Sequence, residues 1–333
     1  MDLSDFSPAQ IAGQRLMTGF KGTLLDDDLR FIIEKIKAGG VILFKRNISS
    51  FEQIRDLCFS IQEYAKSCGQ PPLFIAIDQE GGKVARLGHP WTIFKGNPAM
   101  KNKDDAAYFA ETTANELASI GINMNFAPVM DIATKDGNSI MKDRAFGHDP
   151  SWVSELGTTV IDHLQLNNIM AVAKHFPGIG RTLLDSHIDR PIFNADLNDL
   201  MSFDLIPFKA AISHDVAGIM LSHILYAKLD PKWPASLSYE IAKKILREMM
   251  AFDGLVITDD LDMGAIKKHD NIESAILQIL LSGIDIALIC HQSPDIENAF
   301  NILLDNINKD LYKEGSINCV KRILTYKQKY IKI

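Results

Sequence analysis

The sequence predicts an α/β fold, a single (β/α)8 barrel of the TIM type. Short apolar segments rich in β-branched residues alternate with segments of helical periodicity along the whole chain. Strands that alternate with helices pair in parallel through right-handed crossovers, and eight such units close a barrel. A length of 333 residues suffices for one barrel of this kind. A doubly wound open sheet is the alternative architecture.

Eight segments carry the strand pattern, and most of the intervals between them carry the helix pattern. The expected strands are 16–20, 41–44, 73–78, 124–131, 170–175, 218–223, 255–259 and 284–290. Helical periodicity is clearest at 27–38, 50–68, 104–120, 151–166 and 237–250. Because no Pro-, Gly- or Ser-rich linker divides the chain, we expect one domain over 1–333 that ends in an amphipathic helix at about 306–333.

Composition limits the function classes. A formal net charge of -7 argues against a nucleic-acid-binding surface. The amino terminus lacks the features of a signal peptide, and no run approaches the roughly 18 apolar residues of a membrane span. The cysteines show no metal-binding spacing and suit a reducing compartment; they are Cys58, Cys68, Cys290 and Cys319. We therefore expect a cytoplasmic monomer that has no membrane or nucleic-acid partner.

One predicted strand after another ends in polar residues. The third ends in Asp78, the fourth in Asp131, the fifth in Lys174 and His175, the sixth in His223, and the seventh in Asp259 and Asp260. In a barrel the carboxyl ends of the strands meet on one face, where active sites are built. One such residue is usually a satisfied core group, but five strands that end this way predict a catalytic or binding cleft.

A loop rich in Gly and Pro follows the fifth strand and closes on Asp185-Ser186-His187. In an extended segment, residues two positions apart point to the same side. Asp185 can therefore orient the imidazole of His187, fix its tautomer and raise its basicity, which makes a proton-transfer pair.

The expected cleft combines carboxylates, histidines and the cations Lys174, Arg86 and Arg144. Groups of this kind bind neutral polar sugars, and a carboxylate nucleophile with an acid/base on a loop suits cleavage of a glycosidic bond. A metal-dependent barrel hydrolase is the rival class, but the chain has no early His-x-His pair and no His-Glu-x-x-His motif. A phosphate-binding barrel lacks its late Gly-rich loop. We expect no metal and no cofactor.

Several motifs together resemble one family. The first is Lys174-His175-Phe176-Pro177-Gly178 with Asp185-Ser186-His187. The others are Gly39 to Phe44 with Arg46-Asn47, Ile77-Asp78-Gln79-Glu80-Gly81-Gly82 with Arg86, Ala127 to Asp131 with Arg144-Ala145-Phe146-Gly147, and Ile257-Thr258-Asp259-Asp260-Leu261-Asp262-Met263. They resemble the bacterial β-N-acetylglucosaminidases of glycoside hydrolase family 3, the NagZ-like enzymes of peptidoglycan recycling. The matches run in order over about residues 10 to 290.

The resemblance implies a role for each matched residue. Asp259 would be the nucleophile, with Asp260 and Asp262 as alternatives by spacing, and Asp262 is expected to cap a helix instead. His187 would be the acid/base, oriented by Asp185. The residues that would bind N-acetylglucosamine are Asp78, Arg86, Arg144, Lys174 and His175. Asp131, His223 and Asp260 would lie in the second shell, and for Asp131 and His223 direct contact with the sugar is the alternative.

Two positions depart from the family loop. Ile179 stands where the family commonly has His, and Arg181 where it commonly has Asp, which bears on loop rigidity and aglycone contacts. The expected function is release of terminal N-acetylglucosamine from muropeptides or related glycans. A phosphorylase, a β-glucosidase of the same family and a sugar-binding barrel without catalysis are the alternatives. We expect the whole site to come from one domain.

Overall fold

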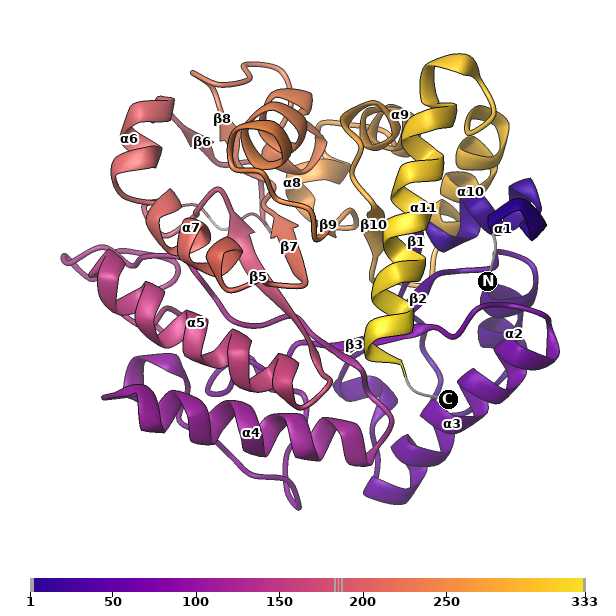
Figure 1. The fold of residues 1–333 in the computed structure, drawn as a ribbon, viewed down its shortest axis with the longest axis horizontal. Helices are drawn as coiled ribbons and strands as arrows, with labels where there is room; N and C mark the ends of the chain where they lie inside the picture. Colours follow the sequence, from indigo (N-terminus) through magenta and orange to yellow (C-terminus); the bar gives the residue numbers. More distant parts are fainter. Residues whose placement is uncertain (1–2, 183, 185, 187, 332–333) are drawn as a thin grey trace.

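The computed structural model describes residues 3–182, 184, 186 and 188–331, and these residues form a closed barrel (Figure 1). In this part of the chain, parallel strands close in the order β1-β10-β9-β7-β5-β4-β3-β2. Their bounds are β1 Leu16–Thr18, β2 Gly40–Leu43, β3 Phe74–Ile77, β4 Met124–Asn125, β5 Met170–Phe176, β7 Gly218–Leu221, β9 Leu255–Asp260 and β10 Ile286–Ile289. Every predicted strand is present, so the barrel prediction is confirmed over the open sheet.

Helices surround the strands, as Figure 1 shows for α3, α4, α5 and α7. Four of the predicted helices begin at a side-chain cap, because Asp26, Ser50, Asn102 and Asp149 each accept a hydrogen bond from the amide three residues on, at 2.9–3.1 Å. The helix bounds are α1 Pro8–Gln14, α2 Asp27–Glu34, α3 Phe51–Ser67, α4 Lys103–Ser119, α5 Pro150–Leu166, α6 Leu197–Ser202, α7 Leu205–Ser213, α8 Gly264–Lys267, α9 Ile272–Ser282, α10 Pro294–Asn306 and α11 Asp310–Tyr330. Short 3-10 turns are η1 Leu3–Asp5, η2 Lys45–Asn47, η3 Asn97–Ala99 and η4 Ala235–Leu237.

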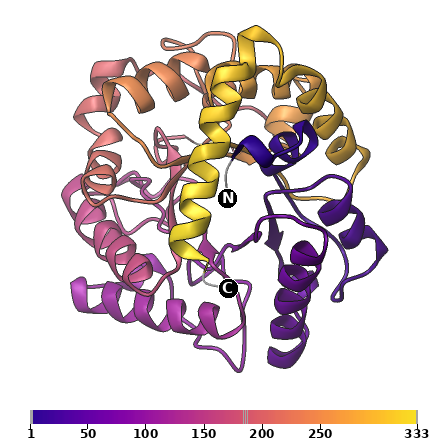
Figure 2. The ribbon, with the colours of Figure 1, turned by 45° about the vertical axis from the view of Figure 1, so that its right-hand side comes forward.

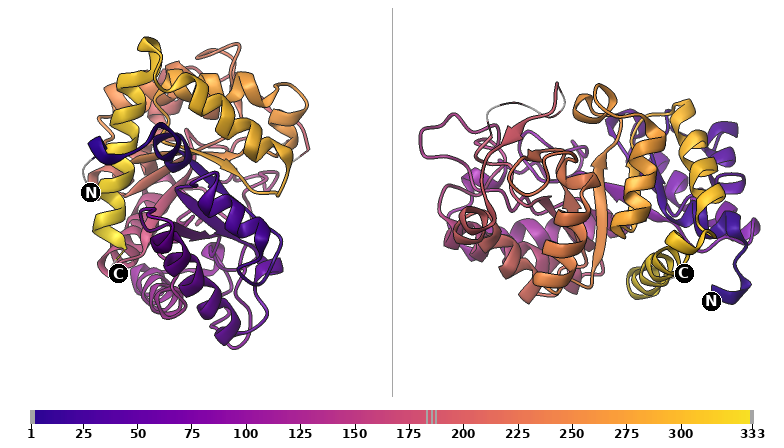
Figure 3. Two further views of the ribbon diagram at one scale, coloured as in Figure 1. Left: turned by 90° about the vertical axis from the view of Figure 1, so that its right-hand side faces the viewer. Right: turned by 90° about the horizontal axis from the view of Figure 1, so that it is seen from above.

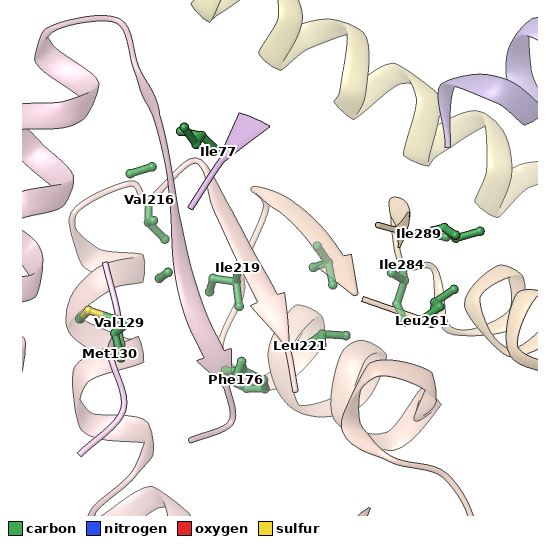
Figure 4. Packing of buried hydrophobic residues seen from close by; sticks show 14 of the residues in the cluster. Ile77, Val129, Met130, Phe176, Val216, Ile219, Leu221, Leu261, Ile284 and Ile289 are labelled. Carbon is green, nitrogen blue, oxygen red and sulfur yellow. The ribbon is translucent and has the colours of Figure 1, made fainter. Parts of the chain in front are cut away.

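The strands bury apolar residues on both faces, with a period of two. Phe74 and Ala76 of β3 belong to a cluster inside the barrel, whereas Ile75 and Ile77 belong to the cluster between strands and helices. Figure 4 shows members of the outer cluster, with Ile219 projecting from β7. This alternation also determines which side chains just beyond each strand point toward the barrel axis.

Helix α11 covers the amino-terminal end of the barrel. Its residues Ile323 and Tyr330 belong to the interior cluster. The buried Lys327 donates from Nζ to Gln14 Oε1 at 2.6 Å and lies 5.3 Å from the centre of the Phe74 ring. Figure 2 shows α11 crossing the ring of elements, and Figure 3 shows α1 beside it. The charged cavity lies at the opposite end.

Two local features differ from expectation. The helix predicted over 237–250 is wound as a π-helix, η5 Glu240–Met249. Two short parallel strands, β6 Ile192–Phe193 and β8 Leu225–Tyr226, pair outside the barrel and join the segments that follow β5 and β7. Strands of two residues are too short for periodicity to reveal. None of the helices formed by the described residues combines the length and apolar character required to cross a bilayer.

Candidate active site

A cavity of about 250 Å³ lies at the carboxyl ends of the strands. The inward series Phe74 and Ala76 continues to Asp78, and the series Leu255 and Ile257 continues to Asp259. On β5 the same alternation brings Lys174 into the cavity. The charged lining is Asp78, Arg86, Arg144, Lys174, His175, Asp259 and Asp260. The cavity is smaller than the roughly 300–1,000 Å³ of pockets for drug-sized ligands, and it suits one small polar ring.

Cations and carboxylates alternate along one wall of the cavity. Lys174 Nζ lies 2.8 Å from Asp78 Oδ1 and 2.6 Å from Glu80 Oε1. Arg86 Nη2 donates to Asp78 Oδ2 at 2.9 Å. Arg144 donates to both oxygens of Glu80, from Nε at 2.9 Å and from Nη2 at 2.7 Å. The five side chains therefore form one continuous network along the cavity.

The network keeps its members charged. Burial alone would raise the pKa of Asp78, but the Lys174 ammonium and the Arg86 guanidinium outweigh it and hold that pKa far below its usual range. The pKa of Glu80 is likewise lowered, since Lys174 and Arg144 outweigh burial. Burial would lower the pKa of Lys174, yet the two carboxylates raise it. The wall thus offers charged partners to hydroxyl and amide groups.

His175 is held by Asp131. The imidazole Nδ1 lies 2.7 Å from Asp131 Oδ2, and the His175 amide donates to the same oxygen at 3.2 Å. The other ring nitrogen, Nε2, lies 3.5 Å from Arg144 Nη2. Asp131 is fully buried, and its contacts with His175 orient the imidazole.

Asp259 and Asp260 end β9 in different environments. Burial would raise the pKa of Asp259, but the positive potential of His223 and His175 outweighs it, and the pKa is lowered. The Asp260 amide also donates to Asp259 Oδ1 at 2.8 Å. Burial raises the pKa of Asp260 to about 6. Of these two carboxylates, Asp259 is therefore the one that its surroundings stabilise in the ionised form.

The start of the loop after β5 is firmly anchored. The Ile179 amide donates to Asp131 Oδ1 at 2.8 Å, and Ser139 Oγ donates to Gly180 O at 2.6 Å. A Cβ on Gly180 would lie 1.9 Å from Ile132 O, so only glycine fits there. Arg181 forms an ion pair with the buried Asp204.

The second half of this loop meets the segment after β9. The Ala265 amide donates to Ser186 O at 3.1 Å, and Arg190 Nε donates to Ala265 O at 2.9 Å. The predicted acid/base pair, Asp185 and His187, lies outside the described residues.

One further expectation concerns Asp262, which lies just beyond β9. The prediction that Asp262 caps a helix is wrong, because α8 begins after Met263 and Asp262 instead pairs with Lys267 Nζ at 2.5 Å. Its other oxygen, Oδ2, accepts from the His291 amide at 2.9 Å, so both carboxylate oxygens have partners other than helix amides.

His223 is fully buried, with its ring nitrogens on Ser236 and on the backbone of Asp260. Among the described residues, the ligand atoms of Asp260, Asp262 and His291 lie within 4.8 Å of one another. The lysine on Asp262 already supplies positive charge to this group.

Sequence reasoning missed Glu80 and the apolar part of the cavity. Glu80 lies three residues beyond the end of β3, in a loop where strand alternation no longer indicates direction, and a carboxylate before Gly81-Gly82 was the available signal. The apolar lining follows the same inward alternation as the charged residues. It consists of Ile42, Phe44, Phe126, Met220, Leu288 and Cys290, with Val84 and Met263 from loops.

Fold and cavity define the class first: a (β/α)8-barrel protein with a small charged pocket at the carboxyl ends of its strands. The model of the Glycosyl hydrolase family 3 N terminal domain matches residues 13–325. The chain therefore belongs to glycosyl hydrolase family 3. The resemblance inferred from the motifs is confirmed.

Curated relatives and solved structures agree with this assignment. The chain is 35% identical over 289 residues to the β-hexosaminidase of Nitrosomonas eutropha, covering 84% of this chain and 81% of that protein. It is 34% identical over 317 residues to β-hexosaminidase A of Pseudoalteromonas piscicida, covering 84% of this chain but 53% of that protein.

A solved family 3 β-N-acetylglucosaminidase from Paenibacillus sp. superimposes with a TM-score of 0.95 at 34% identity, covering 98% of this chain and 63% of that chain. The chain thus spans about half of the Pseudoalteromonas relative and less than two thirds of the Paenibacillus one.

Proposed function

We propose that this chain is a retaining β-N-acetylglucosaminidase that releases terminal N-acetylglucosamine from muropeptides or related glycans. The observation that carries the proposal is Asp259, a carboxylate kept ionised in a cavity of about 250 Å³ beside a wall of charged hydrogen-bonding groups. Two relatives named β-hexosaminidase and a structural neighbour named β-N-acetylglucosaminidase support it.

The proposed reaction has two displacement steps. Asp259 attacks the anomeric carbon while the bond to the leaving oxygen breaks, and His187 gives that oxygen a proton. Water then attacks the same carbon, His187 takes the proton from water, and Asp259 leaves as a carboxylate. Two inversions retain the configuration. Asp78, Arg86, Arg144, Lys174 and His175 are the proposed sugar-binding residues.

Charge in the cavity restricts the choice of acid. Asp78 and Glu80 are poor proton donors near neutral pH, because neighbouring cations lower both of their pKa values. Asp260 has a pKa of about 6 and lines the cavity, so it is the described carboxyl that competes with His187 for this role. The Asp185-x-His187 motif favours His187, because Asp185 would stabilise the imidazolium.

The finer features of the function are part of the same proposal. We place the enzyme in peptidoglycan recycling in the cytoplasm, acting as a monomer on a small carbohydrate. Free cysteines at Cys58, Cys68, Cys290 and Cys319 suit a reducing compartment.

One assay tests the activity and its main alternatives. N-acetylglucosamine release is measured from an anhydro-muropeptide and from chitobiose, each with and without phosphate, and glucose release from an aryl β-glucoside. Hydrolysis of the muropeptide without phosphate is expected. A requirement for phosphate would identify a phosphorylase, and preference for the glucoside would identify a β-glucosidase.

The nucleophile is tested by labelling. A fluorinated N-acetylglucosamine analogue is expected to modify a peptide at Asp259, and Asp259→Ala is expected to lose several orders of magnitude in turnover. A label on Asp260 would show that the neighbouring carboxylate is the nucleophile.

A further inference from the structure

We propose that His223 is a positioning residue for the nucleophile Asp259, acting through the backbone of Asp260 and not by contact with the sugar. The proposal rests on the proposed function, because it concerns the step that Asp259 performs. His223 is fully buried just beyond β7, next to the strand that carries Asp259.

Two contacts orient the imidazole of His223. Its Nε2 lies 2.8 Å from the carbonyl oxygen of Asp260, and its Nδ1 lies 2.6 Å from Ser236 Oγ. A carbonyl oxygen only accepts, so Nε2 carries a proton in this arrangement. Ser236 is itself held, because its amide donates to Ser222 O at 2.9 Å. The ring is thus clamped between η4 and the end of β9.

Asp260 transmits the position of His223 to Asp259. The Asp260 amide donates to Asp259 Oδ1 at 2.8 Å, which fixes the rotation of the nucleophilic carboxylate. From the opposite side, the Cys290 amide donates to Asp260 Oδ1 at 2.9 Å. Asp260 is therefore held by β10 through its side chain, while its carbonyl accepts from His223 and from the Met263 amide, the latter at 3.0 Å. Removal of the His223 contact leaves this carbonyl with its local partner, and the end of β9 loses the contact that comes from the β7 side.

Electrostatics points the same way. His223 contributes positive potential that lowers the pKa of Asp259 against the effect of burial.

Two substitutions separate positioning from packing. The amide nitrogen of Gln reaches as far from the backbone as imidazole Nε2, whereas that of Asn reaches only as far as Nδ1. His223→Gln can keep the bond to Asp260 O, and His223→Asn cannot. His214, an exposed histidine that lies 2.9 Å from Asp162, provides the control variant His214→Asn.

The measurement is kcat and KM on an aryl N-acetylglucosaminide and on the natural disaccharide. We expect His223→Asn to lose about 10–100-fold in kcat with KM within about threefold, since a nucleophile misplaced by about 1 Å loses rate on that scale. The loss should be equal on both substrates, because the nucleophile acts whatever the leaving group. His223→Gln should keep kcat within about threefold, and His214→Asn should match the wild type.

Several outcomes overturn the proposal. Equal losses in the Gln and Asn variants, or unchanged kcat in both, contradict it. If His223→Asn does not fold, the folded His223→Gln decides, and a large loss of kcat in that variant contradicts the proposal. Failure of the proposed function is distinct, because the wild type itself would then release no N-acetylglucosamine.

Discussion

Glu80 is buried between two cations, with Lys174 at 2.6 Å and Arg144 bonded to both of its oxygens. The substitution Glu80→Gln leaves these cations with one neutral partner in a buried site. Breaking a buried ion pair typically lowers the free energy of unfolding by about 3–5 kcal/mol. Urea unfolding measures this, and sugar binding should weaken in parallel because Lys174 loses its orientation.

The exposed pair Lys244–Glu248, 3.0 Å apart, provides the control for this prediction. Glu248→Gln should change stability by less than about 0.5 kcal/mol, because water screens the pair. If the two substitutions lowered the free energy of unfolding by similar amounts, burial would not be the reason why the ion pairs of Glu80 contribute to stability.

The contribution of His187 to the rate of cleavage is expected to depend on the leaving group. A sugar alkoxide needs a proton in the transition state, which is worth about 10²–10⁴-fold in rate, whereas a nitrophenolate leaves with little help. His187→Ala should therefore slow disaccharide cleavage far more than cleavage of an aryl glycoside, and Asp185→Asn should follow the same pattern. Steady-state kinetics on both substrates measures the difference.

Equal slowing of both substrates by His187→Ala would assign the loop to sugar binding. Asp260→Asn is the matched comparison, because Asp260 has a pKa of about 6 in the same cavity. If that variant alone shows the dependence on leaving group, Asp260 is the acid.

At the scale of elements, α11 carries a lysine into the base of the barrel. Burial lowers the pKa of Lys327 well below its ordinary value. The folded state prefers the neutral amine. When the pH falls below the pKa of this lysine in the unfolded chain, about 10.4, the unfolded state takes up a proton more readily, and the free energy of unfolding falls. Stability from this group therefore rises with pH through the alkaline range, by up to about 1.4 kcal/mol per pH unit.

The substitution Lys327→Met removes this dependence. The slope of the free energy of unfolding between about pH 8 and pH 10 should become shallower than in the wild type, as urea titrations at several pH values would show. Lys321→Met, on an exposed position of the same helix, should keep the wild-type slope. An unchanged slope in Lys327→Met would mean that the buried amine gains its proton without a penalty.

For the molecule as a whole, we expect catalysis without a metal, because side chains of the chain supply every charge in the proposed mechanism. Activity should survive exhaustive chelation, measured as N-acetylglucosamine release before and after treatment. Loss of activity on chelation with recovery on zinc addition would favour a metallohydrolase. The group Asp260, Asp262 and His291 would then be the first place to look for the ion.

The barrel was predictable because each strand leaves a short apolar signature and because polar strand ends mark one face. The alternation also anticipates Asp78, Lys174 and Asp259 in one cavity. Glu80 was not predictable in this way, because loop residues have no fixed direction. The ion pair between Arg181 and Asp204 depends on tertiary packing that no local pattern encodes.

The prediction for Asp262 was wrong for the same reason: a local sequence pattern does not reveal which partner a side chain contacts in the folded chain. Asp262 was expected to cap a helix, but its carboxylate pairs with Lys267, five residues along the chain. The β6–β8 pair escaped prediction because two residues cannot display a period.

Strand parity has a consequence for how this gene can change. Side chains alternate across the barrel wall, so one codon inserted within β3 or β9 would turn Asp78 or Asp259 from the cavity toward the helices and move apolar residues to the wrong side. Substitutions at the last inward position of a strand, in contrast, alter the chemistry and leave the wall intact. Variation in sequence length should therefore be confined to the loops, while new specificities arise by point changes in a single layer of residues.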